Sequence, residues 1–215
     1  MSKKNKPFKD WLCEEVETEF GLTRLREHPL LNPLKNLSLA HDDPRRPALE
    51  ELRLLLFDYI DSWNEDEYKF MFISRFIGLA KFVSKYYKVF TQRPLSVKYD
   101  HDAKTTDGNV DFMLAKGRQI PRQPHFFLHE YKPEKRRDND PLGQLLIAMV
   151  AAQLQNNDEK PIYGIYLNGR NWFFVVLEGP SYAVSTAYSA DNNIFDLFAV
   201  LLYFKDLMEQ LYGEL

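Results

Sequence analysis

The sequence predicts one α/β or α+β domain in which helices flank a mixed β-sheet. Its apolar residues follow a helical period up to about Tyr87 and an alternating period from Val89 onward. Beyond that point the expected elements run in the order three strands, helix, two strands, helix, which is typical of a sheet covered by helices. A chain of 215 residues, 45% of them hydrophobic, is long enough to bury one substantial core.

The first 63 residues are expected to form a helical extension that packs on the main body, residues 64–215. Residues 8–20 could form one helix, and four prolines between residues 29 and 47 interrupt the segment that follows. Residues 48–63 carry leucines at helical spacing, which predicts an amphipathic helix. We therefore interpret the N-terminal part as an appendage and not as a separate domain.

The main body is expected to begin with a helix that Ser62 or Asn64 caps and that runs to about Tyr87, with acidic residues in its first turn. Because this helix is apolar on nearly every side, it should lie centrally under other elements. Strands are predicted over Val89–Tyr99, Asn109–Leu114 and His125–Lys132, with a loop from Gly117 to Pro124. The last elements are a helix from Pro141 to about Asn156, a hairpin of Ile162–Leu167 and Trp172–Leu177, and a helix from Asn192 or Asn193 to Tyr212.

The composition excludes several classes of protein. The one cysteine, Cys13, excludes a disulfide scaffold and a cysteine-based zinc site, and it fits a reducing compartment. No apolar run reaches the roughly 18 residues that a membrane span needs. The basic residues 1–7 are followed by no apolar stretch, so they do not predict a secretory signal. We expect a soluble, cytoplasmic protein that does not bind membranes.

The charge is distributed unevenly along the chain. The net charge is -3, yet residues 93–137 contain ten Lys or Arg against six Asp or Glu. This asymmetry is typical of a basic face for a polyanion. An ordinary surface of mixed charges is an equally good interpretation of the same numbers.

Two predicted strands bring acidic and basic side chains together. Asp111 lies within the strand 109–114, while Glu130 and Lys132 share one face at the end of the next strand. Carboxylate oxygens of this kind suit Mg²⁺ or Mn²⁺. Such an ion can polarise a phosphoryl oxygen and lower the pKa of a bound water, and a neighbouring lysine can orient that water. The alternative is a surface cluster of ion pairs on edge strands.

The tripeptide of an acid, any residue and a lysine carries little information by itself, because it occurs four times in this chain. Only Glu130-Tyr131-Lys132 follows an apolar strand and has a strand-borne Asp upstream. The context therefore selects this copy.

In that context the sequence resembles the PD-(D/E)XK nuclease superfamily between about Asn64 and Leu177. The segment 108–111, Gly-Asn-Val-Asp, resembles the Asp turn and strand of the family, and 130–133, Glu-Tyr-Lys-Pro, resembles its Glu-x-Lys. Gln144 to Ala148 resembles the Gln-x-x-x-Ala signature of several branches, and residues 163–174 resemble the hairpin that follows it. No proline precedes Asp111, and the interval of 19 residues to Glu130 requires an extended hairpin tip.

The resemblance implies a restriction-endonuclease-like fold and assigns roles to individual residues. The implied catalytic residues are Asp111, Glu130, Lys132 and Gln144. The implied metal ligands are Glu67, Asp111, Glu130 and the carbonyl of Tyr131, with Glu65 and Glu51 as rivals of Glu67. The basic residues expected to contact nucleic-acid phosphates are Arg118, Arg122, Lys135, Arg136 and Arg137.

From these residues we expect a Mg²⁺- or Mn²⁺-dependent nuclease that hydrolyses phosphodiester bonds of DNA, with RNA as an alternative substrate. A second interpretation is an inactive nuclease-like module that binds nucleic acid or a protein partner. The N-terminal helices are candidates for contact with a second copy or another protein.

Overall fold

The computed structural model describes residues 4–99, 104–132 and 140–212, with the backbone alone for residues 123–132, 211 and 212. In this part of the chain, strands join one sheet in the order β1-β4-β5-β6-β7-β8-β2, while β3 also pairs with β4 and β9 with β7. The strands are β1 (Lys4–Pro7), β2 (Thr23–Leu25), β3 (Lys88–Tyr99), β4 (Lys104–Lys116), β5 (Arg122–Lys132), β6 (Ile162–Asn168), β7 (Asn171–Glu178), β8 (Ser181–Val184) and β9 (Tyr188–Ser189).

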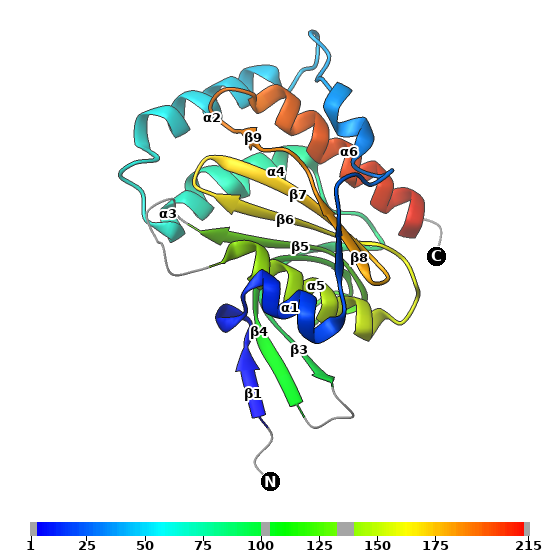
Figure 1. Ribbon diagram of the computed structural model, residues 1–215. Coiled ribbons are helices and arrows are strands. Elements are labelled where there is room, and N and C mark those ends of the chain that lie inside the picture. Colours follow the sequence, from blue (N-terminus) through cyan, green and yellow to red (C-terminus); the bar gives the residue numbers. More distant parts are fainter. Residues whose placement is uncertain (1–3, 100–103, 133–139, 213–215) are drawn as a thin grey trace.

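Helices cover both faces of this sheet (Figure 1). The α-helices are α1 (Cys13–Phe20), α2 (Arg46–Tyr59), α3 (Glu65–Tyr68), α4 (Ser74–Ala80), α5 (Pro141–Asn156) and α6 (Ile194–Tyr212). Three short helices join them, the 3₁₀ turns η1 (Phe8–Asp10) and η2 (Asn32–Asn36) and the π-helical η3 (Lys69–Ile73). No helix among the described residues combines the length and the apolar character that crossing a bilayer requires.

The core consists of two clusters, one on each face of the sheet. In β6, Ile165 packs with α2, α4 and α6, whereas Ile162 packs with α1 and α5. Because side chains of a strand alternate between the two faces, β6 and β7 contribute to both clusters. Trp172 on β7 is fully buried and lies edge-on to Phe76 of α4.

The predicted fold class, a mixed sheet flanked by helices, is confirmed. β3 and β4 are antiparallel, β4 and β5 are antiparallel, and β5 runs parallel to β6 after the crossover through α5. The helix predicted from Pro141 to Asn156 has those bounds in the structure. A parallel pair requires such a crossover, which is why the helix lies between these strands.

The N-terminal part differs from the helical extension that we expected. It contributes two strands to the sheet, β1 parallel to β4 and β2 parallel to β8. The single helix expected over residues 8–20 is divided into η1 and α1, since Trp11 and Leu12 between them are extended. The indole N–H of Trp11 donates to Thr106 Oγ1 of β4 at 3.0 Å, and this tertiary contact stabilises the extended backbone between η1 and α1.

The helix expected from Asn64 to Tyr87 is shorter and less regular than predicted. It contains the π-helical turn η3 and ends at Ala80, because Lys81 is left-handed with φ 55°. Phe70 is 74% exposed, so the helix is covered on most of its surface but not on all of it.

Candidate functional site

An opening in the sheet marks the candidate site. Along one edge of β4, β1 pairs with Lys104–Asp107 and β5 with Phe112–Lys116. The four residues between, 108–111, take part in neither of these described pairings. A cleft of about 500 Å³ opens at this gap, and residues of the N-terminal segment, α3, η3, β3, β4 and α5 line it.

The buried Asp111 is the centre of a polar cluster in this cleft. Its side chain is largely buried, and its Oδ1 accepts hydrogen bonds from Lys69 Nζ and Gln92 Nε2, both at 2.7 Å. Lys69 Nζ also donates to Glu65 Oε1 at 2.5 Å. One ammonium group thus lies between two carboxylates that come from a helix and a strand.

Lys69 and Gln92, the two partners of Asp111 named above, come from irregular backbone. Lys69 begins the π-helical turn η3, a rare conformation that is frequent at functional sites. Gln92 stands opposite Asp111, between the pairs Thr91–Phe112 and Arg93–Val110, and its φ of 50° is left-handed. A residue other than glycine pays a conformational cost there, and such residues cluster at active sites.

This strain at Gln92 predicts an unusual order of stabilities. Gln92→Gly should be more stable than Gln92→Ala by about 1 kcal/mol, because only glycine adopts a left-handed φ without strain. Thr91 provides the control, since the same two substitutions beside it meet no positive φ and alanine should be the more stable. Urea denaturation of the four variants measures both differences, and the same order at both positions would contradict the strain.

The charge of Lys69 is maintained by its partners. Burial lowers the pKa of Lys69, but the Asp111 carboxylate, followed by Glu65, more than offsets this and raises the pKa above its ordinary value. The lysine is therefore an ammonium ion at neutral pH. Two carboxylates converging on one cation are also the kind of hard oxygen donors that Mg²⁺ and Mn²⁺ prefer.

The donor set fits a divalent ion in part. Glu65 and Asp111 supply two carboxylates, and Mg²⁺ needs one or two in addition to water and phosphate oxygens. Among the described side chains, those of residues 5–99, 104–122 and 140–210, no group of three or more His, Cys, Asp or Glu is placed to hold a metal. The predicted third carboxylate, that of Glu130, is not among the side chains described.

The backbone nevertheless brings the two predicted motifs together. Phe112 of β4 pairs with His129 of β5. Because the two strands are antiparallel, Asp111 and Glu130 are the next residues on β4 and β5 beyond this pair. Glu130 and Lys132 pair with β6 on the other side of β5, as does Tyr131 between them. The predicted residues Lys135, Arg136 and Arg137 lie outside the described part of the chain.

The structure places Glu65, and not Glu67, beside Asp111. The Glu67 carboxylate accepts the Asn64 N–H at 2.8 Å, while Asn64 Oδ1 accepts the Glu67 N–H at 2.9 Å. This reciprocal pair is a capping box, and it turns Glu67 toward the helix end. Glu51, the other rival, is exposed and pairs with Arg75 of α4.

Gln144 lines the cleft, but its side-chain amide binds the backbone of the N-terminal segment. Its side chain is buried and Nε2 donates to the carbonyl of Lys9 at 3.2 Å. Asp140, at the start of the same helix, accepts the N–H of Cys13 at 2.7 Å. Gln144 and Asp140 therefore fasten the N-terminal segment against α5, where it forms one wall of the cleft.

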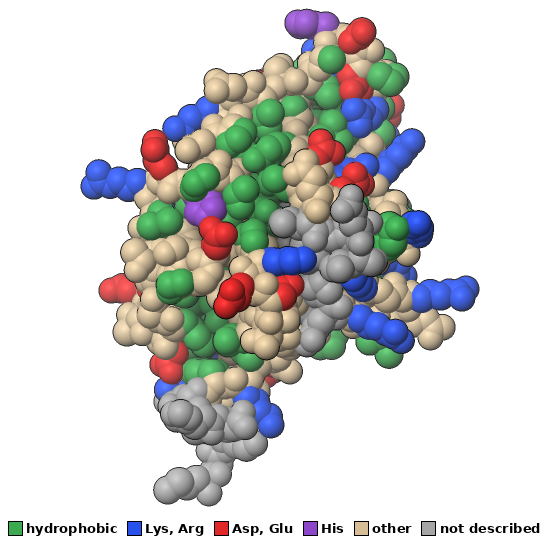
Figure 2. Space-filling model, turned by 90° about the vertical axis from the view of Figure 1, so that its right-hand side faces the viewer, with side chains coloured by type: hydrophobic (Ala, Val, Ile, Leu, Met, Phe, Trp, Pro, Cys, Tyr) green, Lys and Arg blue, Asp and Glu red, His purple; other side chains and the backbone are tan. Residues whose placement is uncertain are grey.

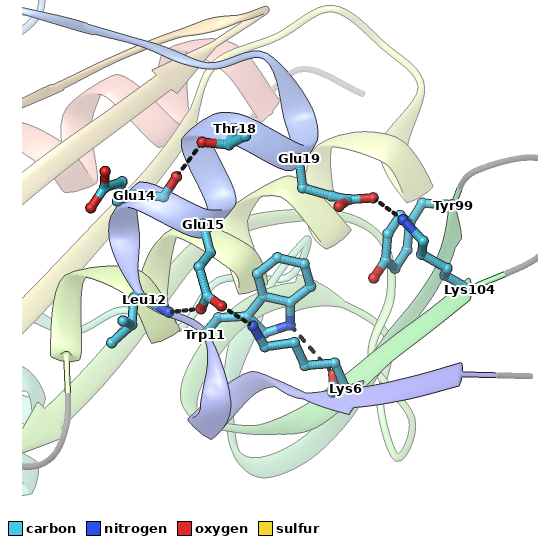
Figure 3. Close-up of a pocket in the computed structure, with 9 residues that line it drawn as sticks. All are labelled: Lys6, Trp11, Leu12, Glu14, Glu15, Thr18, Glu19, Tyr99 and Lys104. Carbon is cyan, nitrogen blue, oxygen red and sulfur yellow. Dashed lines mark hydrogen bonds and ion pairs between the residues drawn. The ribbon is translucent and has the colours of Figure 1, made fainter.

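The other side of this N-terminal segment borders a second hollow (Figure 3). There Lys6 lies over the ring of Trp11, 4.2 Å from its centroid, and pairs with Glu15 at 2.8 Å. Lys104 pairs with Glu19 in the same way. These contacts tie β1 and α1 to the sheet, so we interpret this hollow as a structural junction.

Arg118 and Arg122 lie away from the cleft. Both are exposed at the connection of β4 and β5, where they line a shallow hollow of their own. Arg118 follows Asp111 by seven residues, which places it roughly 20 Å away along the strand direction. On the face of the molecule in Figure 2, basic side chains are scattered among acidic ones.

Sequence reasoning missed Lys69 and Gln92. The spacing of Glu65 and Lys69, four residues apart on a helix, indicated that they could pair, but it did not indicate that the pair faces a cleft. Nothing in the sequence indicates the left-handed φ of Gln92. By contrast, the pattern Asn64-x-x-Glu67 is the sequence signature of a capping box.

No family model matches the chain, and no curated protein shows significant similarity to it.

Proposed function

We propose that the protein is a metal-dependent nuclease with a restriction-endonuclease-like fold, which hydrolyses phosphodiester bonds of DNA. The order β3, β4, β5, α5, β6 supports the proposal, because it is the order that the PD-(D/E)XK resemblance implies. The directions of these strands support it as well, since Phe112 and His129 are paired and antiparallel, so that Asp111 just before one and Glu130 just after the other are neighbours at the opening of the sheet.

The observation that carries the proposal is the convergence on Asp111. A buried carboxylate in a cleft accepts bonds from Lys69 in a π-helical turn and from Gln92 with a left-handed φ. A structural ion pair needs neither irregularity, and strained residues of this kind cluster at active sites. Strained backbone in a polar cleft favours a functional role.

Each residue then receives a role. Glu65, Asp111 and Glu130 would hold the ion, with Glu65 in place of Glu67, and Gln92 would fix the orientation of the Asp111 carboxylate. A divalent ion bound there would polarise the scissile phosphate and acidify a water. Lys132 would position the attacking water, as the resemblance implies. Gln144 would support the wall of the cleft.

The assignment of the helix carboxylate has a direct test. With plasmid and single-stranded DNA and with RNA, the wild type should cleave DNA in Mg²⁺ or Mn²⁺ and not in EDTA. Glu65→Gln should lower the cleavage rate by about a hundredfold, because a charged ligand is lost next to the ion. Glu67→Gln should change the rate by less than about threefold, since Glu67 only caps a helix end.

If Glu67→Gln lowered the cleavage rate more than Glu65→Gln, Glu67 would be the metal ligand in place of Glu65. Equal traces of activity in the wild type and Asp111→Ala would instead indicate a contaminating nuclease and contradict the proposal.

The alternative is a nuclease-like module without catalysis that binds nucleic acid or a protein. The ammonium of Lys69 favours it, because this cation already pairs with the carboxylates of Glu65 and Asp111. Calorimetric titration with Mn²⁺ separates the two. The inactive module would show no saturable site that depends on Asp111 and Glu130.

A further inference from the structure

Lys69 lies where a divalent ion would have to bind. Its Nζ is 2.5 Å from Glu65 Oε1 and 2.7 Å from Asp111 Oδ1, distances typical of charge-assisted hydrogen bonds. Its side chain is only 15% exposed, so solvent screens its charge weakly. Because Asp111 Oδ1 already accepts hydrogen bonds from Lys69 and Gln92, an ion that binds this oxygen has to displace one of the two donors.

We propose that Lys69 competes with the divalent ion for Glu65 and Asp111, so that its ammonium must leave these two carboxylates when the ion binds. The inference rests on the proposed function and adds the regulation of the same site. In the metal-free protein the lysine holds the two like charges together, which would otherwise repel each other. The affinity for the metal then depends on how readily the ion replaces the Lys69 ammonium at these two carboxylates.

The surroundings of Lys69 allow this exchange. A lysine carries its charge on a flexible stem of four carbons, so the ammonium can move while the backbone stays in place. Lys69 lines the cleft of about 500 Å³, which offers room for the displaced ammonium. Gln92 remains on Asp111 Oδ1 and keeps the carboxylate oriented.

The test is a calorimetric titration of the full chain with MnCl₂, without nucleic acid. Lys69→Met keeps the length of the stem and removes the charge, so it should bind Mn²⁺ at least about tenfold more tightly than the wild type. Lys98→Met is the matched control, because Lys98 is an exposed lysine of β3 outside the cleft. Its affinity should stay within about twofold of the wild type.

A second variant protects the test against a folding defect. Lys69→Gln is neutral, but its amide can still donate to a carboxylate, so it should fold even where the methionine variant does not. It should also bind Mn²⁺ more tightly than the wild type. Thermal denaturation with and without Mn²⁺ gives an independent reading, and the rise in Tm caused by Mn²⁺ should be larger in both Lys69 variants.

The outcomes separate this inference from the proposed function. Unchanged or weaker binding in the Lys69 variants would overturn the competition while leaving the nuclease proposal intact. A second outcome is tighter Mn²⁺ binding in Lys69→Met that is lost when Asp111→Asn is added, in a protein that cleaves no nucleic acid. It would support the competition and overturn the nuclease proposal. Absence of Mn²⁺ binding in all variants would overturn both.

Discussion

Asp111→Asn is expected to lower the metal-dependent rate of DNA cleavage by about a thousandfold, equivalent to about 4 kcal/mol. The substitution keeps the shape of the side chain and removes the charge at the centre of the cluster. Asn presents one neutral oxygen to Lys69 and Gln92, which both donate to Asp111 Oδ1. Neither the ion nor these two donors can then be held as before.

Asp107→Asn is the control for this variant. Asp107 is the other acid of β4 that lines the cleft, and the same charge is removed. Its substitution should cost less than about tenfold in rate, because it lies outside the cluster around Lys69. The account would be contradicted if both variants lost activity equally, or if folded Asp111→Asn, checked by circular dichroism, cleaved DNA like the wild type.

Gly143→Ala is expected to destabilise the protein by about 3 kcal/mol, because it forces apart two backbone segments. A Cβ at Gly143 would lie 2.5 Å from the carbonyl oxygen of Trp11 and 2.7 Å from the amide nitrogen of Cys13. Neither atom belongs to a flexible side chain. The N-terminal segment would have to leave the start of α5, which would open one wall of the cleft. Differential scanning calorimetry should record a fall in Tm of roughly 8 °C.

Gly78→Ala is the matched control within another helix. Gly78 lies inside α4, and a Cβ there meets no atom within 4 Å. Alanine favours a helix over glycine, so this variant should gain about 0.5–1 kcal/mol. A Gly143→Ala protein as stable as the wild type would show that the N-terminal segment is not fixed against α5.

The sequence predicted those parts of the fold that local patterns determine. The bounds of α5 follow from Pro141 at its start and a long apolar run, and the hairpin of β6 and β7 follows from its Asn-Gly turn. β1 and β2 could not be predicted, because strands of four and three residues have no pattern of their own. Their partners on β4 and β8 lie far away in the sequence, and only the folded chain brings them together.

The same distinction applies to the site. Asp111 could be predicted because a carboxylate in an apolar strand is unusual, and its neighbour Glu130 could be placed by strand alternation. Lys69 could not be predicted. A lysine near the start of a helix is ordinarily a surface residue, and only tertiary packing directs this one into a cleft. Gln92 adopts its left-handed φ opposite Asp111 within a long strand, where no turn residue or glycine in the sequence predicts one.

The most direct test of the proposed metal site is the anomalous diffraction of crystals soaked in MnCl₂. We expect one strong peak within coordination distance of the carboxylates of Glu65 and Asp111, with the ammonium of Lys69 moved away from them. A difference map without a peak there, or with Lys69 still bridging both carboxylates at saturating Mn²⁺, would contradict the account.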